Sequence, residues 1–104
     1  MSREKMLNRE LIVPAIKKYC SENYKKSMVS ALLPVDGNRH RVEITVDDID
    51  FFVDFHFRPN GATSIDISSG RHLDKKKQIK DLLLNDPSIL LVEGLKQVVD
   101  VENR

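Results

Sequence analysis

The chain has 104 residues, with 17 lysines and arginines against 16 aspartates and glutamates, and hydrophobic residues make up 40% of it. This composition predicts one folded domain over residues 1–104 and excludes a protein that binds nucleic acid through a strongly basic surface overall. No apolar run approaches the ~20 residues of a membrane helix, and the single cysteine excludes an internal disulfide. We therefore expect a cytoplasmic protein that needs no cofactor and contacts no membrane.

The first predicted element is a helix that runs from Asn8, its expected N-cap, to about Tyr24. Its apolar residues recur at the spacing of one helix face: Leu11, Ile12, Ala15, Ile16, Tyr19 and Cys20. Pro14 interrupts this pattern and predicts either a kink or a later start of the helix. Because Cys20 lies on the apolar stripe, we expect a buried core thiol rather than a nucleophile.

Four strands in an antiparallel meander are predicted next, because apolar and polar residues alternate over 27–33, 41–46, 49–58 and 63–68. Their pairing is set by three expected turns, which are Asp36-Gly37, Asp47-Asp48 and Arg58-Pro59-Asn60-Gly61. The turns predict these apolar pairs: Leu33 with His40, Ala31 with Val42, Val29 with Ile44, Ile44 with Phe51, Val42 with Val53, Phe55 with Ile65, and Val53 with Ile67.

A second helix is expected from its N-cap, Asp74, to just before Asn85, with Ile79, Leu82 and Leu83 as its core stripe. The predicted core spans about residues 7–86. A C-terminal element at 88–101 follows as either a helix or a short edge strand, and Gly94 disfavours the helix by about 1 kcal/mol. The predicted class is therefore α+β, with four strands and with helices on one face of the sheet.

The other face of the sheet is expected to carry a row of charges, in which Arg41, Asp54 and Asp66 align across three strands. Two interpretations are open. The two carboxylates could bind a divalent metal, or Arg41 could neutralise them in a surface ion-pair row, and the sequence favours the second.

Phe52 is expected on the same face, beside Met28 and Leu32. A surface aromatic in this position could stack on a nucleobase, contact a partner protein or have no ligand. The predicted partner-binding residues are Met28, Leu32, Phe52 and Leu84.

The start of the second helix is the most basic part of the chain, and its lysines oppose the helix dipole. Lysines at a helix N-terminus suit phosphate groups, although they could equally form an ordinary solvated face. The predicted nucleic-acid-binding residues are Arg39, His40, Arg71, Lys75, Lys76, Lys77 and Lys80. The sequence contains no paired-histidine zinc motif, nucleophile elbow or phosphate loop, so we expect no enzyme and assign no catalytic residue or metal ligand.

The segment Val53–Ile65, VDFHFRPNGATSI, followed by Ser69-Gly70 and a helix, resembles the N-terminal repeats of ribonuclease LS toxins. These are the RnlA-type toxins of bacterial toxin–antitoxin and phage-defence loci. The resemblance runs from about Leu7 to Leu84 and implies a fold like half of a TATA-binding protein. In that family RNA is cleaved in a separate helical domain whose arginine–histidine motif this sequence lacks. The resemblance therefore implies a stand-alone module, without catalytic residues, that is regulatory, forms dimers or contacts nucleic acid.

A double-stranded-RNA-binding domain is the alternative. Gly37-Asn38-Arg39-His40 resembles the loop by which such domains reach an RNA minor groove, and Lys76-Lys77-Gln78-Ile79-Lys80 resembles their phosphate-spanning lysines. Three departures count against this alternative: a fourth predicted strand, Asn38 in place of the loop proline, and three leucines where that fold is rich in alanine. Protein binding is thus the first hypothesis, and binding of RNA or DNA is the second.

Overall fold

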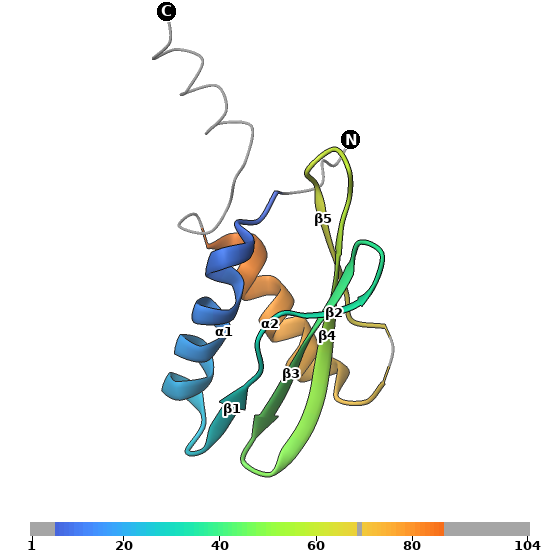
Figure 1. The fold of residues 1–104 in the computed structure, drawn as a ribbon. Coiled ribbons are helices and arrows are strands. Elements are labelled where there is room, and N and C mark those ends of the chain that lie inside the picture. The colour runs from blue at the N-terminus through green and yellow to red at the C-terminus, as the bar shows by residue number, and fades with distance from the viewer. Residues whose placement is uncertain (1–5, 69, 87–104) are drawn as a thin grey trace, which may run out of the picture.

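The computed structural model describes residues 6–68 and 70–86, which form two helices packed on one face of an antiparallel sheet (Figure 1). The elements are α1 (Arg9–Asn23), β1 (Ser27–Val29), β2 (Leu33–Asp36), β3 (Arg39–Val46), β4 (Ile49–Phe57), β5 (Thr63–Asp66) and α2 (Leu73–Asn85). The strand order is β1-β3-β4-β5, and β2 also pairs with β3. The predicted α+β class is confirmed. The C-terminal element predicted at 88–101 lies outside the described residues.

The hydrophobic core lies between the helices and the sheet. Its fully buried side chains come from both helices and the two central strands: Ile12, Ile16, Cys20, Val42, Ile44, Val46, Val53, Phe55, Ile79 and Leu83. The predicted burial of Cys20 is confirmed, and this burial raises the pKa of its thiol. Leu82, expected in the core stripe of α2, is only partly buried.

Helix α1 begins as predicted, because the side chain of Asn8 accepts a hydrogen bond from the backbone N–H of Glu10 at 3.0 Å. The helix continues through Pro14 to Asn23, so the alternative of a later start is wrong. Just before the helix, the backbone N–H of Leu7 donates to the hydroxyl of Thr63 at 3.3 Å. This contact ties the entry of α1 to the edge strand β5.

The central hairpins have the predicted registers. Val42 lies opposite Val53, and Phe55 lies opposite Ile65. Between β3 and β4, Asp47 and Asp48 both have positive φ, at 48° and 69°, as a type I′ turn requires. Gly61, with φ of 93°, supplies the left-handed residue of the next turn.

The strand predicted at Ser27–Leu33 is wrong in its second half, because the structure divides it into β1 and β2. Val29 pairs with Ile44 as expected, but Leu33 lies opposite Arg41 instead of His40. Ala31 therefore does not pair with Val42. Between the strands, the Ser30 hydroxyl accepts from the backbone N–H of Glu43 at 2.9 Å and donates to the carbonyl of Ala31 at 2.7 Å. These bonds accompany a one-residue shift of register, which turns Leu33 away from the core and moves the hairpin turn to Gly37-Asn38.

Two boundaries near the fourth predicted strand are also corrected. Strand β5 ends at Asp66, because its carboxylate accepts hydrogen bonds from the backbone N–H and the hydroxyl of Ser68, at 2.9 and 2.6 Å. The expected pair of Val53 with Ile67 is therefore not formed. Helix α2 starts at Leu73, before the predicted cap Asp74, and follows a left-handed His72 without a side-chain capping bond.

The β3–β4 turn allows a test of backbone strain. Replacing Asp48 by glycine is expected to raise the free energy of unfolding by about 0.5 kcal/mol, because glycine adopts positive φ without a steric penalty. Urea denaturation measures the change. In contrast, the same replacement at Asp36, which lies in β2 and does not have positive φ, should be destabilising. The strain argument would be contradicted if Asp48→Gly lowered the free energy of unfolding as much as Asp36→Gly does.

Candidate binding site on the open face of the sheet

The face of the sheet opposite the helices, called the open face below, presents rows of side chains from adjacent strands. Arg41, Asp54 and Asp66 form one row, as predicted. Glu43 lies opposite Phe52 in the next row, and Thr45 lies opposite Asp50 in the row after that. Because cross-strand neighbours point to the same side of a sheet, these residues share one surface.

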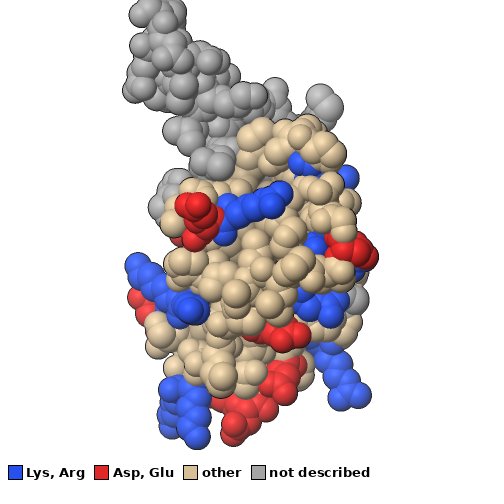
Figure 2. All heavy atoms as spheres, in the orientation of Figure 1, with Lys and Arg blue, Asp and Glu red and all other residues tan. Residues whose placement is uncertain are grey.

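Charges of both signs are interspersed on the side of the molecule shown in Figure 2. Acidic side chains gather at the bottom of that view, where the β3–β4 turn with Asp47 and Asp48 lies in Figure 1. The surface visible there therefore has no extended basic stripe of the kind that tracks a phosphate backbone. In the described part of the chain, neither helix is long and apolar enough to cross a membrane.

Asp54 is the buried charge of the open face, with a residual exposure of 2%. Arg41 binds its two oxygens through Nε and Nη2, at 2.7 and 3.2 Å, and Arg39 Nη2 lies 3.4 Å from Oδ2. The hydrogen bond to Asp54 raises the pKa of Arg41. The carboxylate is thus satisfied by two guanidinium groups, which supports the ion-pair interpretation of this row. Within residues 6–68 and 70–86, no group of three or more acidic, histidine or cysteine side chains could hold a metal.

Asp66, the outer carboxylate of the row, is stabilised in its charged form. Hydrogen bonds from the hydroxyl and the backbone of Ser68 lower its pKa below the ordinary value of 3.8. A carboxyl group with a lowered pKa stabilises the fold above its unfolded-state pKa, and this contribution is lost as the pH falls through the folded-state pKa.

Stability measurements against pH can test this assignment. The difference in unfolding free energy between the natural chain and Asp66→Asn is expected to shrink as the pH falls from about 5 to about 2.5. Asparagine keeps the size of the side chain and its acceptor oxygen. A difference that stays constant over this range would show that the charge of Asp66 is not stabilised by Ser68.

Phe52 lies half-buried on the open face, and two cations lie over its ring. The Arg41 guanidinium carbon is 3.9 Å from the ring centroid, and Lys76 Nζ is 4.4 Å from it. These are cation–π distances. A nucleobase could stack on this ring only if one of the two cations moved away, so the geometry favours a structural or protein-contacting role over base stacking.

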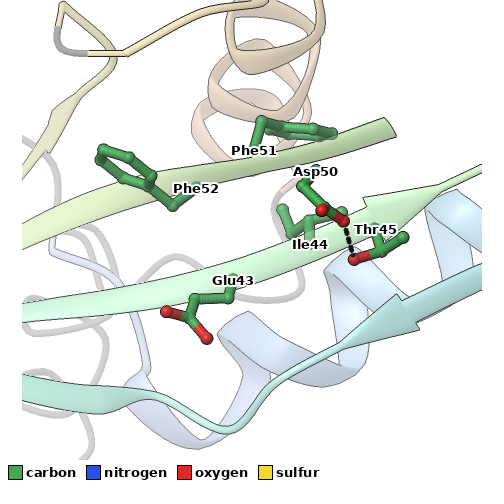
Figure 3. A pocket seen from close by; sticks show the side chains of 6 residues that line it. All are labelled: Glu43, Ile44, Thr45, Asp50, Phe51 and Phe52. Carbon is green, nitrogen blue, oxygen red and sulfur yellow. Dashed lines mark hydrogen bonds between the residues drawn. The ribbon is translucent and has the colours of Figure 1, made fainter. Parts of the chain in front are cut away.

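A shallow pocket on the open face, called the acidic pocket below, lies between β3 and β4 beside Phe52 (Figure 3). It is lined by Glu43, Ile44, Thr45, Asp50, Phe51 and Phe52. The Thr45 hydroxyl donates to Asp50 Oδ1 at 2.6 Å. Sequence reasoning missed this pocket, because Glu43 and Asp50 read as ordinary outward positions of two alternating strands. Only their places in adjacent rows of the predicted hairpin could have indicated it.

The predicted partner-binding residues separate into two groups. Met28 is 74% exposed, and its strand neighbour is Thr45, at the acidic pocket. Together with Phe52 it belongs to the open face. Leu32 and Leu84 instead pack against the hydrophobic core. The register shift adds a residue that was not predicted, since Leu33 lies opposite Arg41 and is 37% exposed.

The predicted nucleic-acid-binding residues differ in how accessible their side chains are. Lys76 is buried, with 1% exposure, while Lys75 Nζ lies 3.9 Å from the carboxylate of Asp74. Arg71 and Lys77 are exposed and Lys80 is partly exposed.

The two members from the first hairpin, Arg39 and His40, alternate along β3. Arg39 contacts Asp54, whereas the His40 ring packs edge-on against Phe57 at 5.2 Å between centroids. The Nδ1 atom of His40 is buried, and in the described part of the chain it has no hydrogen-bond partner. His40 is therefore placed for packing rather than for contact with a phosphate.

Comparison with known families extends these observations. The family model described as RNase LS, bacterial toxin N-terminal, matches residues 2–83. This match covers the segment on which the resemblance in the sequence rests, and it confirms that resemblance. No curated protein matches the chain.

Proposed function

Because the chain belongs to the family of RNase LS bacterial toxin N-terminal domains, we propose that it is a non-enzymatic module that binds a protein partner through its open face. The observation that carries this proposal is the exposure of Met28 on the face that also bears Phe52 and that the two helices do not cover. The proposed setting is a toxin–antitoxin or phage-defence system, and the description of the matching family as a bacterial toxin domain supports the first of these.

The composition of the open face supports a protein partner. Methionine, aromatic residues and arginine are enriched in protein–protein interfaces, and Met28, Phe52 and Arg41 lie in three neighbouring rows here. A methionine exposed to 74% gains free energy when a partner removes its apolar surface from water. Charged side chains around it would form the polar rim of such an interface.

Nucleic-acid binding is the competing function, and the exposed Arg71 and Lys77 at the start of α2 are what favours it. Two further lysines of the predicted cluster are less available, since Lys76 is buried and Lys75 lies beside Asp74. A clamp with so few free cations would contact few phosphates and bind weakly at physiological salt.

A binding experiment can separate the two functions. The purified protein is titrated calorimetrically with the purified products of the genes adjacent to its own. We expect Met28→Ala to weaken binding of a partner by about tenfold, because alanine lacks most of the apolar surface that methionine would bury in the interface. Leu11→Ala, at an exposed leucine on α1 and therefore on the helical side, is the matched control and should leave affinity unchanged.

The competing function is tested in parallel by fluorescence anisotropy with labelled RNA and DNA duplexes over a range of salt concentrations. If nucleic-acid affinity falls steeply with salt and is weakened by Lys77→Glu, while Met28→Ala leaves the binding of a protein partner unchanged, the proposal is overturned.

A further inference from the structure

We propose that the segment of the partner that docks on the open face is basic, and that the acidic pocket receives one of its arginine or lysine side chains. This inference rests on the proposed function and specifies the chemistry of the partner. It is carried by the side chains that line the pocket and by the apolar residue beside it.

The pocket places two carboxylates on one exposed surface. Glu43 and Asp50 come from adjacent strands, one register step apart, with Phe52 and Thr45 as their cross-strand neighbours (Figure 3). The hydrogen bond from Thr45 engages Oδ1 of Asp50, which leaves the other carboxylate oxygen without a bond to any described residue. That oxygen is available to accept from a cationic donor.

The carboxylates of the pocket differ from Asp54 in how they are paired. Asp54 is buried and bound by two arginines, whereas neither Glu43 nor Asp50 forms an ion pair with any residue in 6–68 or 70–86. The neighbouring Arg41 does not compensate them fully, since its Nε and Nη2 atoms are both bonded to Asp54. The two pocket carboxylates therefore remain open to a charge from outside the chain.

The surroundings of the pocket strengthen the same charge preference. Asp47 and Asp48 follow in the β3–β4 turn at this end of the sheet. Nearby, Lys26 bonds Asp47 through its backbone N–H at 2.9 Å, and Lys76 lies over Phe52. The acidic groups outnumber these cations locally, so the field at the pocket attracts a basic segment and repels an acidic one.

An exposed apolar side chain lies in the same row as Asp50, because Met28 is the neighbour of Thr45 on β1 and Asp50 is its neighbour on β4. Arginine and lysine carry an apolar stem and a charged head. A side chain of this kind can lay its stem against Met28 while its head donates to Asp50 and Glu43. Phe52 would bound the pocket on the remaining side.

The probe for the test is a synthetic peptide, acetyl-Gly-Val-Arg-Val-Arg-Val-Gly-amide, titrated into the ¹⁵N-labelled protein. Two further peptides replace both arginines by citrulline, a neutral isostere, or by glutamate. We expect the arginine peptide to shift the amide signals of Glu43, Thr45, Asp50 and Phe52, with affinity about tenfold higher than that of the citrulline peptide. The glutamate peptide should leave these signals unchanged.

Variants of the pocket supply the second readout. Glu43→Gln and Asp50→Asn preserve side-chain size, and together they are expected to abolish the preference for arginine over citrulline. Asp36→Asn, at an exposed carboxylate of β2, is the matched control and should retain it. An arginine peptide that shifts none of these amides, or that binds no better than its citrulline form, overturns the inference.

The experiments distinguish a failure of this inference from a failure of the proposed function. If an adjacent gene product binds in a manner sensitive to Met28→Ala but insensitive to the pocket double variant, the open face binds a partner that is not basic, and only the present inference fails. If Met28→Ala also leaves partner binding unchanged, both proposals fail.

Discussion

Replacing Asp54 by alanine is expected to lower the free energy of unfolding by about 3 kcal/mol, the largest effect we predict for a single charged residue. The carboxylate is 2% exposed and binds Arg41 at 2.7 and 3.2 Å. Removing it leaves a guanidinium group over Phe52 without its counter-charge. The Arg41 side chain retains 31% exposure, so water compensates part of the loss and the expected cost lies at the low end for a broken buried pair.

Urea denaturation of Asp54→Ala and of the control Asp36→Ala measures this effect. Asp36 is exposed on β2, and its replacement should change the unfolding free energy by no more than about 0.5 kcal/mol. Adding Arg41→Ala to Asp54→Ala completes a double-mutant cycle. Arg41→Ala should lower the free energy of unfolding less in the Asp54→Ala variant than in the natural chain. A loss below about 1 kcal/mol for Asp54→Ala would show that this ion pair does not stabilise the sheet.

Replacing Lys76 by alanine is expected to destabilise the fold by about 2 kcal/mol, whereas replacing the adjacent Lys77 has little effect. Lys76 is 1% exposed, and its ammonium lies 4.4 Å from the centre of the Phe52 ring. The stem thus fills buried space between α2 and the sheet, and the head reaches the open face. Gly70 packs against the same group, since a Cβ atom there would lie 2.9 Å from Lys76 Nζ.

Lys76→Met separates the contribution of the stem from that of the charge. Methionine retains most of the buried apolar contact, so we expect about half the loss caused by alanine. Thermal and urea denaturation of the three variants provide the comparison. Equal losses in Lys76→Met and Lys76→Ala would assign the effect to the charge, and no loss in either would contradict the burial of this side chain.

The two central hairpins could be predicted from the sequence because their turns are short and chemically specific. The turn at Asp47-Asp48 has two residues with positive φ, and the next turn has the sequence Pro-Asn-Gly. Each turn allows only one register in which apolar residues pair with apolar residues. The predictions failed where side chains bond to the backbone nearby. Ser30 shifts the register of the edge, and Asp66 ends β5 through Ser68. Alternation of apolar and polar residues does not report such bonds.

The candidate site could be predicted only in part. Alternation correctly placed Met28, Phe52 and Asp54 on the open face. Helical periodicity indicated that Lys76 faces the core side, but its contact with Phe52 depends on the path of the chain from β5 to α2, which periodicity does not determine. The acidic pocket contains two carboxylates that form no ion pair with the residues that the structure describes, and such pairing cannot be read from residue types alone.

The interrupted edge formed by β1 and β2 has a consequence for solubility. A continuous, straight edge strand offers a row of free backbone groups on which further chains can add and polymerise. Here the break at residues 30–32 and the changed register divide that row into segments of three and four residues. Neither segment is long enough to template a stable added strand. This edge of the sheet is therefore poorly suited to growth into fibres by strand addition.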